Sequence, residues 1–400
     1  MSNYVADEPM VKVSRTSLRA VIGSIVISIA FVMELTLVPL VLPEIQADFG
    51  LSVNQLAMVF NSYGVSVAAG VFLGGLFGDT IGVRKVFTVG VLMFAAGALI
   101  VAFANNYPTL IAARMLQGFG GGMFSPLVPL LLTRAMPEKP GKILIIWGSI
   151  AGYTAAIAPL ALSQAVVYAG WQSVFVLFAI ISLVALAISG RMLAGPSREE
   201  MRKRPTLSPL LREPILWIVF VYIGCTYGAI TFYMFSLPLW LSSINYNVNM
   251  VGFVLAVMWL SFSLVSTSMR NRVDSEHVRL IMICAPLMIA LSFPMAYFAN
   301  GLSGFLLSAF LLGAGFAGSN SPSTQMVLKF APKGLQAISA SMDITFARIG
   351  GVVTVALLAQ FEFSQSMWVV MCMSVYAMIC ASVIGSRSVE MARQASQPNF

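Results

Sequence analysis

Charged side chains are scarce in this chain of 400 residues, of which they make up only 10%. Soluble domains average about 25% charged residues, whereas apolar residues here reach 58% and the mean hydropathy is +0.89. This composition argues strongly against a soluble enzyme and predicts an all-α polytopic membrane protein. The net charge of +8 does not indicate nucleic-acid binding, because basic residues of membrane proteins gather in cytoplasmic loops.

Histidine and cysteine are also scarce. His277 is the only histidine, and the four cysteines fall within apolar stretches without a CxxC pair. The sequence shows no metal-ligand cluster, no disulfide framework, no nucleophile motif and no GxxxxGK(S/T) phosphate loop. We therefore expect no enzyme activity, no metal and no cofactor other than a proton gradient. Transport driven by ATP bound to this chain is not supported.

A cleavable signal peptide is not expected either. Residues 1–17 are polar, and the first apolar segment, 18–42, is not followed by an A-x-A-like cleavage site of small residues. It is also longer than the roughly 7–15 residues of a signal h-region. We interpret this segment as a spanning helix.

Twelve apolar segments reach the roughly 20 residues that a spanning helix needs. They run over 18–42, 55–77, 85–104, 109–134, 142–168, 171–193, 214–242, 250–269, 278–299, 302–328, 335–359 and 366–386. We expect twelve transmembrane helices in two six-helix halves, an N-terminal bundle at 18–193 and a C-terminal bundle at 214–386. The polar stretch 194–213 is predicted to be a cytoplasmic linker, and 1–17 and 387–400 to be cytoplasmic tails.

Basic residues are confined to one side of this arrangement. Of the 23 Lys and Arg residues, Arg114 and Arg348 lie inside spans, and the other 21 lie at the termini or in the connections that follow even-numbered spans. The opposite loops hold only Glu44, Asp48 and Glu362. The positive-inside rule places both termini in the cytoplasm and predicts a multi-pass protein of the bacterial inner or plasma membrane.

The two halves are related by an internal repeat. The run 119–126 aligns with the run 315–322 at an offset of 196 residues, and both runs end in Ser-Pro. Span order and loop polarity follow the same offset, so the two halves have the same orientation. Parallel repeats of this kind are a transporter architecture, with the solute site between the halves near the midplane.

The segment 109–134 holds Arg114 at membrane depth. A charge there costs roughly 3 kcal/mol on insertion scales and needs a partner or a water-filled cavity. Four glycines follow Gln117 and allow neighbouring backbones to approach closely, while Pro126 and Pro129 interrupt the helical hydrogen-bond ladder. These features indicate a moving, solute-lined helix, with a static helix and a structural arginine as the alternative.

At this point the chain resembles the major facilitator superfamily. The run 75–85, GLFGDTIGVRK, is similar to the loop signature of that family between spans 2 and 3, although Thr80 and Val83 stand where basic residues are common. The resemblance implies a cytoplasmic conformational latch formed by Gly75, Asp79, Gly82 and Arg84.

A second motif resembles the drug/proton antiporter branches of the family. Residues 114–118 match their RxxQG signature, and the run ELTLVPLVLPEI from Glu34 is also similar to them. The resemblance implies that Glu34 is a proton-coupling residue and that Arg114 is its partner. The signature of the fifth span keeps only Pro159 and lacks its paired glycines, which leaves the direction of transport open.

Further side chains are candidates for the wall of a central site. Asp343 is a second proton-coupling candidate, and Arg348 is five residues away, about 140° around an ideal helix, so the two are not expected to pair along one face. We predict a substrate site formed by polar and aromatic residues at mid-span. Its predicted members are Glu34, Asn61, Arg114, Gln117, Tyr153, Tyr227, Tyr233, Trp259, Asn320, Gln325 and Arg348.

The leading hypothesis is a monomeric, proton-coupled secondary transporter that works by alternating access. It would exchange protons for an amphipathic or drug-like small molecule, most simply as an efflux antiporter, and needs no partner beyond substrate, protons and lipid bilayer. One alternative is an uptake or exchange carrier for a small organic anion that uses Arg114 and Arg348. Another is a membrane scaffold or receptor without transport. A cation exporter requires a free Glu34, whereas an anion carrier requires free arginines.

Overall fold

The computed structural model describes residues 15–138, 140–189, 208–269, 278–298, 301–332 and 335–396. Within these ranges the chain is helical and has no strand. Twelve helical segments are long and apolar enough to cross a membrane, and each coincides with one of the twelve predicted spans. The predicted fold class is therefore confirmed, while the cytoplasmic placement of the termini stays a prediction.

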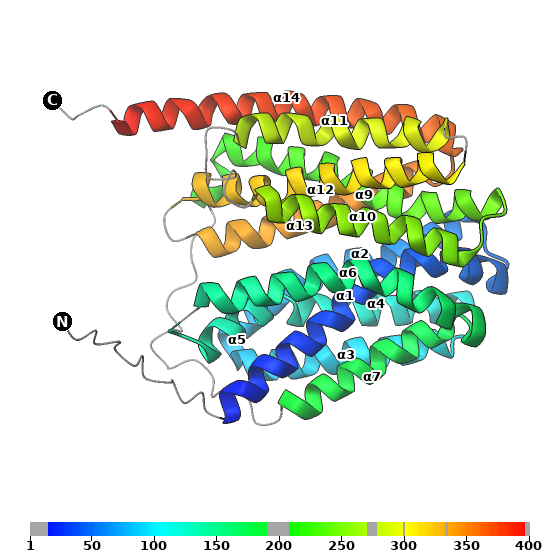
Figure 1. The fold of residues 1–400 in the computed structure, drawn as a ribbon. Helices are drawn as coiled ribbons and strands as arrows, with labels where there is room; N and C mark the ends of the chain where they lie inside the picture. Colours follow the sequence, from blue (N-terminus) through cyan, green and yellow to red (C-terminus); the bar gives the residue numbers. More distant parts are fainter. Residues whose placement is uncertain are drawn as a thin grey trace, which may run out of the picture.

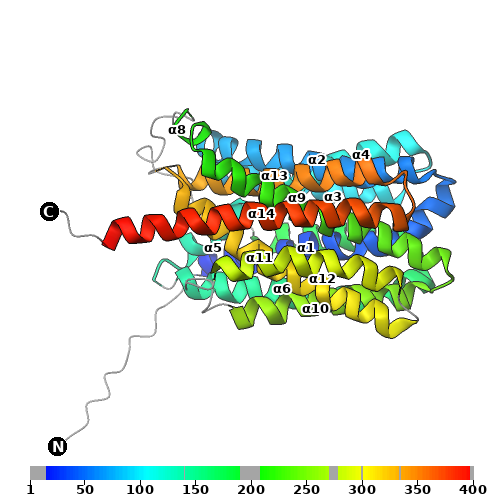
Figure 2. The same cartoon turned by 90° about the horizontal axis from the view of Figure 1, so that it is seen from above.

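The helices form two groups that lie side by side (Figure 1). The first group contains α1 (Arg15–Phe49), α2 (Val53–Phe77), the π-helical turn η1 (Gly78–Gly82), α3 (Val83–Ala102), α4 (Tyr107–Phe124), α5 (Leu127–Ala135), α6 (Pro140–Ala169) and α7 (Gln172–Ser189). The second contains the short α8 (Ser208–Leu211), α9 (Pro214–Ser243), α10 (Val248–Met269), α11 (Val278–Tyr297), α12 (Leu302–Phe330), α13 (Gln336–Leu358) and α14 (Phe363–Ser396). Helix α1 begins and α14 ends on the same side of the molecule, called here the termini side (Figures 1 and 2).

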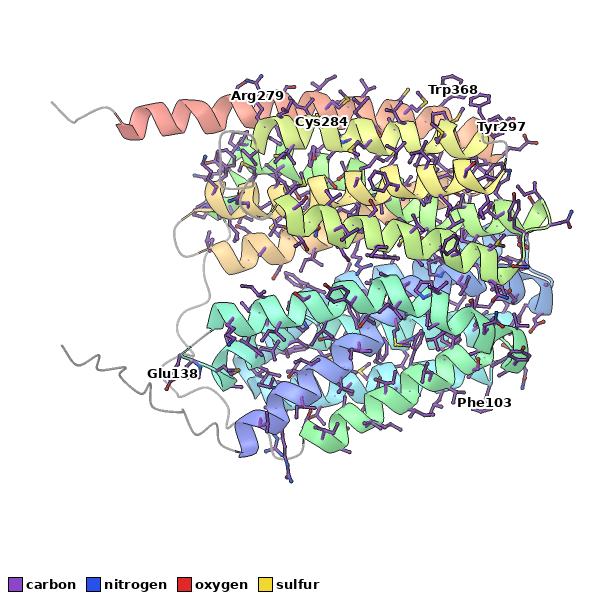
Figure 3. The ribbon with its side chains drawn as sticks, in the orientation of Figure 1. Phe103, Glu138, Arg279, Cys284, Tyr297 and Trp368 are labelled. Carbon is purple, nitrogen blue, oxygen red and sulfur yellow. The ribbon has the colours of Figure 1, made fainter. Side chains whose placement is uncertain are left out.

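The outer surface of the bundle is apolar. Phe103 and Trp368 point away from the helices (Figure 3) and are 73% and 62% exposed. Large apolar side chains that are exposed on spanning helices are suited to contact with lipid, because hydrocarbon offers no hydrogen-bonding partners.

Helix α1 is longer than predicted. It continues through Pro39 and Pro43 to Phe49. The prediction that the span ends at residue 42 and that a loop follows at once is therefore wrong. The apolar run stops at Pro43, but the last turns of the helix are held by a contact with the residue that precedes α7. The indole of Trp171 donates a hydrogen bond of 2.6 Å to Asp48 Oδ2. The helix then ends at Gly50, whose φ of +61° is the left-handed conformation of a glycine cap.

The fourth span is interrupted as predicted. The side chain of Asn106 caps the start of α4 by accepting a hydrogen bond of 2.9 Å from the Thr109 backbone N–H. The helix closes at Ser125, and Pro126 separates it from α5. Because proline has no N–H to continue the ladder, the span changes course here and exposes residues of both pieces to the space between the groups.

The glycines after Gln117 bring α4 against α2. A Cβ atom on Gly118 would overlap the carbonyl oxygen of Tyr63, and one on Gly122 would overlap that of Val67. This contact confirms the predicted close approach of the backbones and fixes the height of Arg114 relative to α2.

Alanine at Gly122 should therefore destabilise the protein, since the added methyl meets rigid backbone rather than a flexible side chain. We expect Gly122→Ala to cost about 1–3 kcal/mol, as is typical of overpacking. Gly148→Ala is the matched control, because a Cβ there meets nothing within 4 Å. Thermal unfolding in detergent measures the effect, and equal melting temperatures for the two variants would contradict the packing argument.

Candidate functional site

A central cavity of about 420 Å³ lies between the two helix groups. Its wall includes Trp147, Thr324 and Asp343, each of which lies about two turns from the end of its helix on the termini side. We call this space the central cavity. It is formed by helices of both groups, so a change in their relative position changes its shape.

A second, inner cavity of about 50 Å³ adjoins the central cavity. Glu34, Asn61, Tyr63 and Arg114 line it from the first group. Six residues line both spaces, namely Leu35, Tyr227, Thr231, Met234, Ala347 and Arg348. Arg348 therefore stands at the junction between the two cavities.

A buried ion pair closes the first-group side of the inner cavity. Arg114 Nη1 donates a hydrogen bond of 2.6 Å to Glu34 Oε1, and each side chain is only 2% exposed. The same nitrogen donates to Gln117 Oε1 at 2.8 Å. The guanidinium carbon lies 4.4 Å from the centre of the Tyr63 ring, a distance at which a cation is attracted to the face of the ring. Three side chains, Glu34, Gln117 and Tyr63, thus hold one positive charge.

Several polar atoms around this pair have no hydrogen-bond partner among the described residues. They are Arg114 Nε, Gln117 Nε2 and Asn61 Oδ1. A buried donor or acceptor left unpaired costs about 1–3 kcal/mol. The pair is therefore surrounded by more hydrogen-bonding capacity than its protein neighbours use, which is a common property of functional sites.

The second group contributes its own acid. Asp343 is 6% exposed, and its Oδ2 accepts a hydrogen bond of 2.6 Å from the Thr324 hydroxyl. Arg348 forms no salt bridge with any residue that the structure describes, in agreement with the spacing of the two residues on α13. The hydroxyl of Tyr227 bonds to Asn320 Oδ1 close by.

Aromatic side chains cover the rest of the central cavity. The Tyr227 ring lies 5.3 Å from the Phe316 ring, and Trp259 lies 5.7 Å from Phe316, both as centre-to-centre distances. On the opposite wall, the Trp147 indole donates to the Ser28 hydroxyl at 2.8 Å. Such walls offer flat apolar surface with polar tips, which suits amphipathic ligands.

The structure brings most of the predicted residues together. The inner cavity contains Glu34, Asn61, Arg114, Tyr227 and Arg348, and the central cavity contains Tyr227, Trp259, Asn320, Asp343 and Arg348. Gln117 reaches the site through its bond to Arg114.

Three predicted lining residues lie elsewhere. Tyr153 is 63% exposed on α6 and lines neither the inner nor the central cavity. Tyr233 is buried inside the second group, where its hydroxyl bonds to Ser308 at 2.7 Å. Gln325 lines neither the inner nor the central cavity. These helices are apolar on every side, so polarity alone did not reveal which face is turned inward.

Sequence reasoning also missed residues of the central cavity, namely Trp147, Phe316 and Thr324. Thr324 offered a weak signal, because it follows the repeated Ser-Pro and directly precedes the predicted Gln325. Trp147 and Phe316 sit in long apolar runs, where an aromatic residue gives no indication of the face it occupies.

The predicted latch is described only in part. Gly82 has a φ of +98°, which confirms that this position requires a residue without a side chain. Arg84 is exposed at the start of α3. The surroundings of Gly75 and the side chain of Asp79 lie outside what the structure describes, so the latch stays a prediction.

Removing the Arg114 side chain should destabilise the protein more than neutralising the Glu34 carboxylate. Arg114→Ala leaves Glu34 buried without its partner, and such losses are typically about 3–5 kcal/mol. Glu34→Gln keeps an acceptor for Arg114 and should cost less. The double variant Glu34→Gln/Arg114→Ala should recover part of the loss, and thermal unfolding of the wild type, the two single variants and the double variant measures the coupling free energy. Additive effects would show that the pair is not coupled.

Comparison with known proteins identifies the architecture. The family model of the Major Facilitator Superfamily matches residues 23–355. Two solved structures share the fold at low sequence identity. The nucleoside transporter NupG is 12% identical with a TM-score of 0.78, covering 92% of this chain and 99% of its own. A D-xylose–proton symporter is 15% identical with a TM-score of 0.74, covering 92% of this chain and 96% of its own.

Curated relatives are similar over part of their length. The MFS-type transporter EfpA of Mycobacterium tuberculosis is 26% identical over 80% of this chain and 61% of its own. The riboflavin transporter RibZ of Clostridioides difficile is 27% identical over 42% of this chain and 37% of its own. The cephamycin export protein CmcT of Amycolatopsis lactamdurans is 32% identical over 44% of this chain and 35% of its own. The chain thus spans about three-fifths of EfpA and little more than a third of the other two.

The family match covers most of the twelve spanning helices and all the residues that line the two cavities. The chain therefore belongs to the Major Facilitator Superfamily and is a multi-pass bacterial membrane protein of this transporter family.

Proposed function

We propose that the protein is a proton-coupled secondary transporter that exports small amphipathic organic molecules by alternating access. The observation that carries the proposal is the buried pair of Glu34 and Arg114, which borders a cavity shared by both helix groups. An ionisable pair at membrane depth is expensive to maintain and marks a pathway for ions or substrate by default. The proposal assigns this chain transport and no catalysis.

Glu34 is the proposed proton carrier. A proton that binds its carboxylate removes the negative charge and weakens the attraction to Arg114. Arg114 is not released by this step, because Gln117 and the Tyr63 ring still hold it. The contact between Glu34 and Arg114 can therefore break and form again while Arg114 stays in place. Repeated protonation of Glu34 requires such a reversible contact.

The packing between the groups supports alternating access. Away from the termini side they are in contact, since Asn61 Nδ2 donates to the Val352 carbonyl at 3.0 Å and the Phe60 and Phe235 rings lie 5.6 Å apart. The central cavity lies nearer the termini. If the termini are cytoplasmic, as the basic residues predict, this arrangement is inward-facing. Glu34 then lies in the inner cavity, which adjoins the central cavity.

Export is the direction that the relatives favour. CmcT is named as a cephamycin export protein, and another relative as a tetracenomycin C resistance and export protein of Streptomyces glaucescens. The match covers about a third of each of these proteins. RibZ carries the name of a riboflavin transporter, so we keep a nutrient carrier as an alternative. The proposed location is the bacterial inner membrane, and the proposed working unit is a monomer.

Arg348 favours a second candidate function, a carrier of small organic anions. Glu34 neutralises Arg114, whereas Arg348 forms no salt bridge with the described residues and borders both cavities. A free cation in such a cavity is suited to bind a carboxylate or phosphate of the substrate. The charge of the transported molecule separates the two candidates.

Proton movement tests the leading proposal. Proteoliposomes with a pH-sensitive dye inside are challenged with lipophilic cations, neutral amphiphiles and organic anions. We expect a substrate of one class to move protons in the opposite direction, and Glu34→Gln to reduce the signal to that of empty liposomes. Glu44→Gln, on the same helix but outside both cavities, should retain it. Proton movement that persists in Glu34→Gln would refute the assignment, and silence across all classes would favour a scaffold or receptor.

Arg348 variants test the second candidate. A hydrogen bond to a charged group is worth about 1.5–3 kcal/mol, so Arg348→Gln should weaken binding of an anionic substrate by about 10–100-fold. Arg348→Lys should retain part of the affinity, and Arg212→Gln, at an exposed position, should have no effect. Isothermal titration in detergent gives the affinities. Equal binding by wild type and Arg348→Gln would eliminate the anion carrier.

A further inference from the structure

A third space opens sideways between the two helix groups. It is a cleft of about 640 Å³, formed by α6 on one side and by α10 and the edge of α12 on the other. Figure 1 shows α6 and α10 on either side of the boundary between the two groups, and Figure 2 shows them at one edge of the bundle. Leu264 and Tyr153, which line the cleft, are 61% and 63% exposed. We call this space the lateral cleft, and it faces the region that the bilayer occupies.

The wall of the lateral cleft combines apolar and hydroxyl groups and contains no charged residue among those described. Its hydroxyl side chains, apart from Tyr153, are Ser149, Ser263, Ser266, Thr267, Ser268 and Ser321. The buried hydroxyl of Ser266 has no hydrogen-bond partner among the described residues. This composition contrasts with the central cavity, which contains Asp343 and Arg348, and it suits a molecule with an apolar body and a neutral polar group.

The cleft widens toward the termini side because α6 and α10 diverge. Near their other ends the backbones touch, since a Cβ on Gly252 would lie 2.7 Å from the Pro159 carbonyl oxygen. Further along, the Ser263 hydroxyl donates to the Gly152 carbonyl at 3.2 Å. One turn beyond, a Cβ on Gly148 would meet nothing within 4 Å. The opening is thus a built feature of two helices that are pinned at one end.

An aromatic layer separates the lateral cleft from the central cavity. Phe262 lines the cleft, while Phe316 and Trp259 line the cavity. The Phe262 and Phe316 ring centres are 4.6 Å apart, and Phe262 and Trp259 are 5.7 Å apart. Each of these rings lines only one of the two spaces, and Phe262 is only partly buried. Rotation of the Phe262 side chain would leave Phe316 and Trp259 as the last rings between the cleft and the cavity.

We propose that the lateral cleft is an entry site for neutral amphiphiles, which pass from the membrane leaflet on the termini side to the central cavity by way of Phe262. The proposal rests on the transport function proposed above and names one substrate class for it. The hydroxyl groups bind the polar end of the molecule, and Leu260 and Leu264 contact its apolar body. Phe262 acts as the gate.

A different reading of the cleft is a surface that closes when the two groups rock together. The small residues on both walls, such as Gly148 and Ser321, fit that reading as well. The two readings differ in what occupies the cleft in the state described here. A neutral amphiphile is enriched in an entry site, whereas a mere closing surface holds whatever lipid surrounds it.

The test uses the purified full chain in liposomes with hexadecanol that carries a diazirine. After brief illumination, mass spectrometry locates the labelled residues. We expect labelling of the segment 260–269 to exceed that of other lipid-facing helices, and Gly148→Trp to reduce it about tenfold, equivalent to about 1.4 kcal/mol. Ile157→Trp, on the same helix outside the cleft, should leave it unchanged. Phe262→Ala, or Phe262→Leu if alanine impairs folding, should extend labelling to Phe316 and Asn320 in the central cavity.

Three results would overturn the proposal. They are equal labelling of the cleft and other lipid-facing helices, no effect of Gly148→Trp, and no label in the central cavity of the folded Phe262 variant. A diazirine-bearing phosphatidylcholine provides a further arm, and cleft labelling by it as strong as that by hexadecanol would reduce the cleft to an ordinary lipid groove. Labelling needs no proton flux, so these outcomes are independent of the Glu34→Gln experiment.

Discussion

The buried contact between Glu34 and Arg114 is the constraint on which the rest of the site depends. A charge within the bilayer is tolerated only with a partner or water, so α1 and α4 must keep these side chains together at one height. The glycine contact between α4 and α2 sets that height, and the cap at Asn106 fixes where α4 begins. Backbone packing and electrostatics therefore determine each other here. A shift of α4 by one turn would separate the pair and bring the large side chain of Met115 or Phe119 into the helix contact.

The same constraint explains the asymmetry between the two groups. In the first group the cation is neutralised by an acid from another helix, which joins α1 to α4. In the second, Asp343 and Arg348 lie on one helix and form no salt bridge with the residues that the structure describes, and Asp343 accepts a hydrogen bond from Thr324 instead. One group thus holds a closed pair and the other an acid and a cation that both face the cavity. The two halves of the site therefore differ in the charges that they leave available.

The sequence predicted the spans from a local rule and the central pair from the resemblance to the antiporter branches. Length and apolarity define a spanning helix, and the RxxQG run implied Arg114 as the partner of Glu34. The facing of each helix was harder to predict. Tyr227 and Tyr233 are six residues apart on α9, about 120° around the helix, yet Tyr227 lines the cavity and Tyr233 is buried against Ser308. On a helix that is apolar all round, only the packing of the other helices decides this. The same limit concealed Trp147 and Phe316.

The aromatic layer at Phe262 and Phe316 follows from the charges behind it. Asp343 and Arg348 are compatible with the membrane because they face the central cavity, and direct contact with hydrocarbon would cost roughly 3 kcal/mol per charge on insertion scales. The lateral cleft, in contrast, has hydroxyl groups but no charge among its described residues, so it tolerates lipid on its open side. A wall of rings between the two spaces lets each keep its own polarity. Because the wall consists of side chains and not of backbone, the rotamers of Phe262, Phe316 and Trp259 decide whether the two spaces are joined.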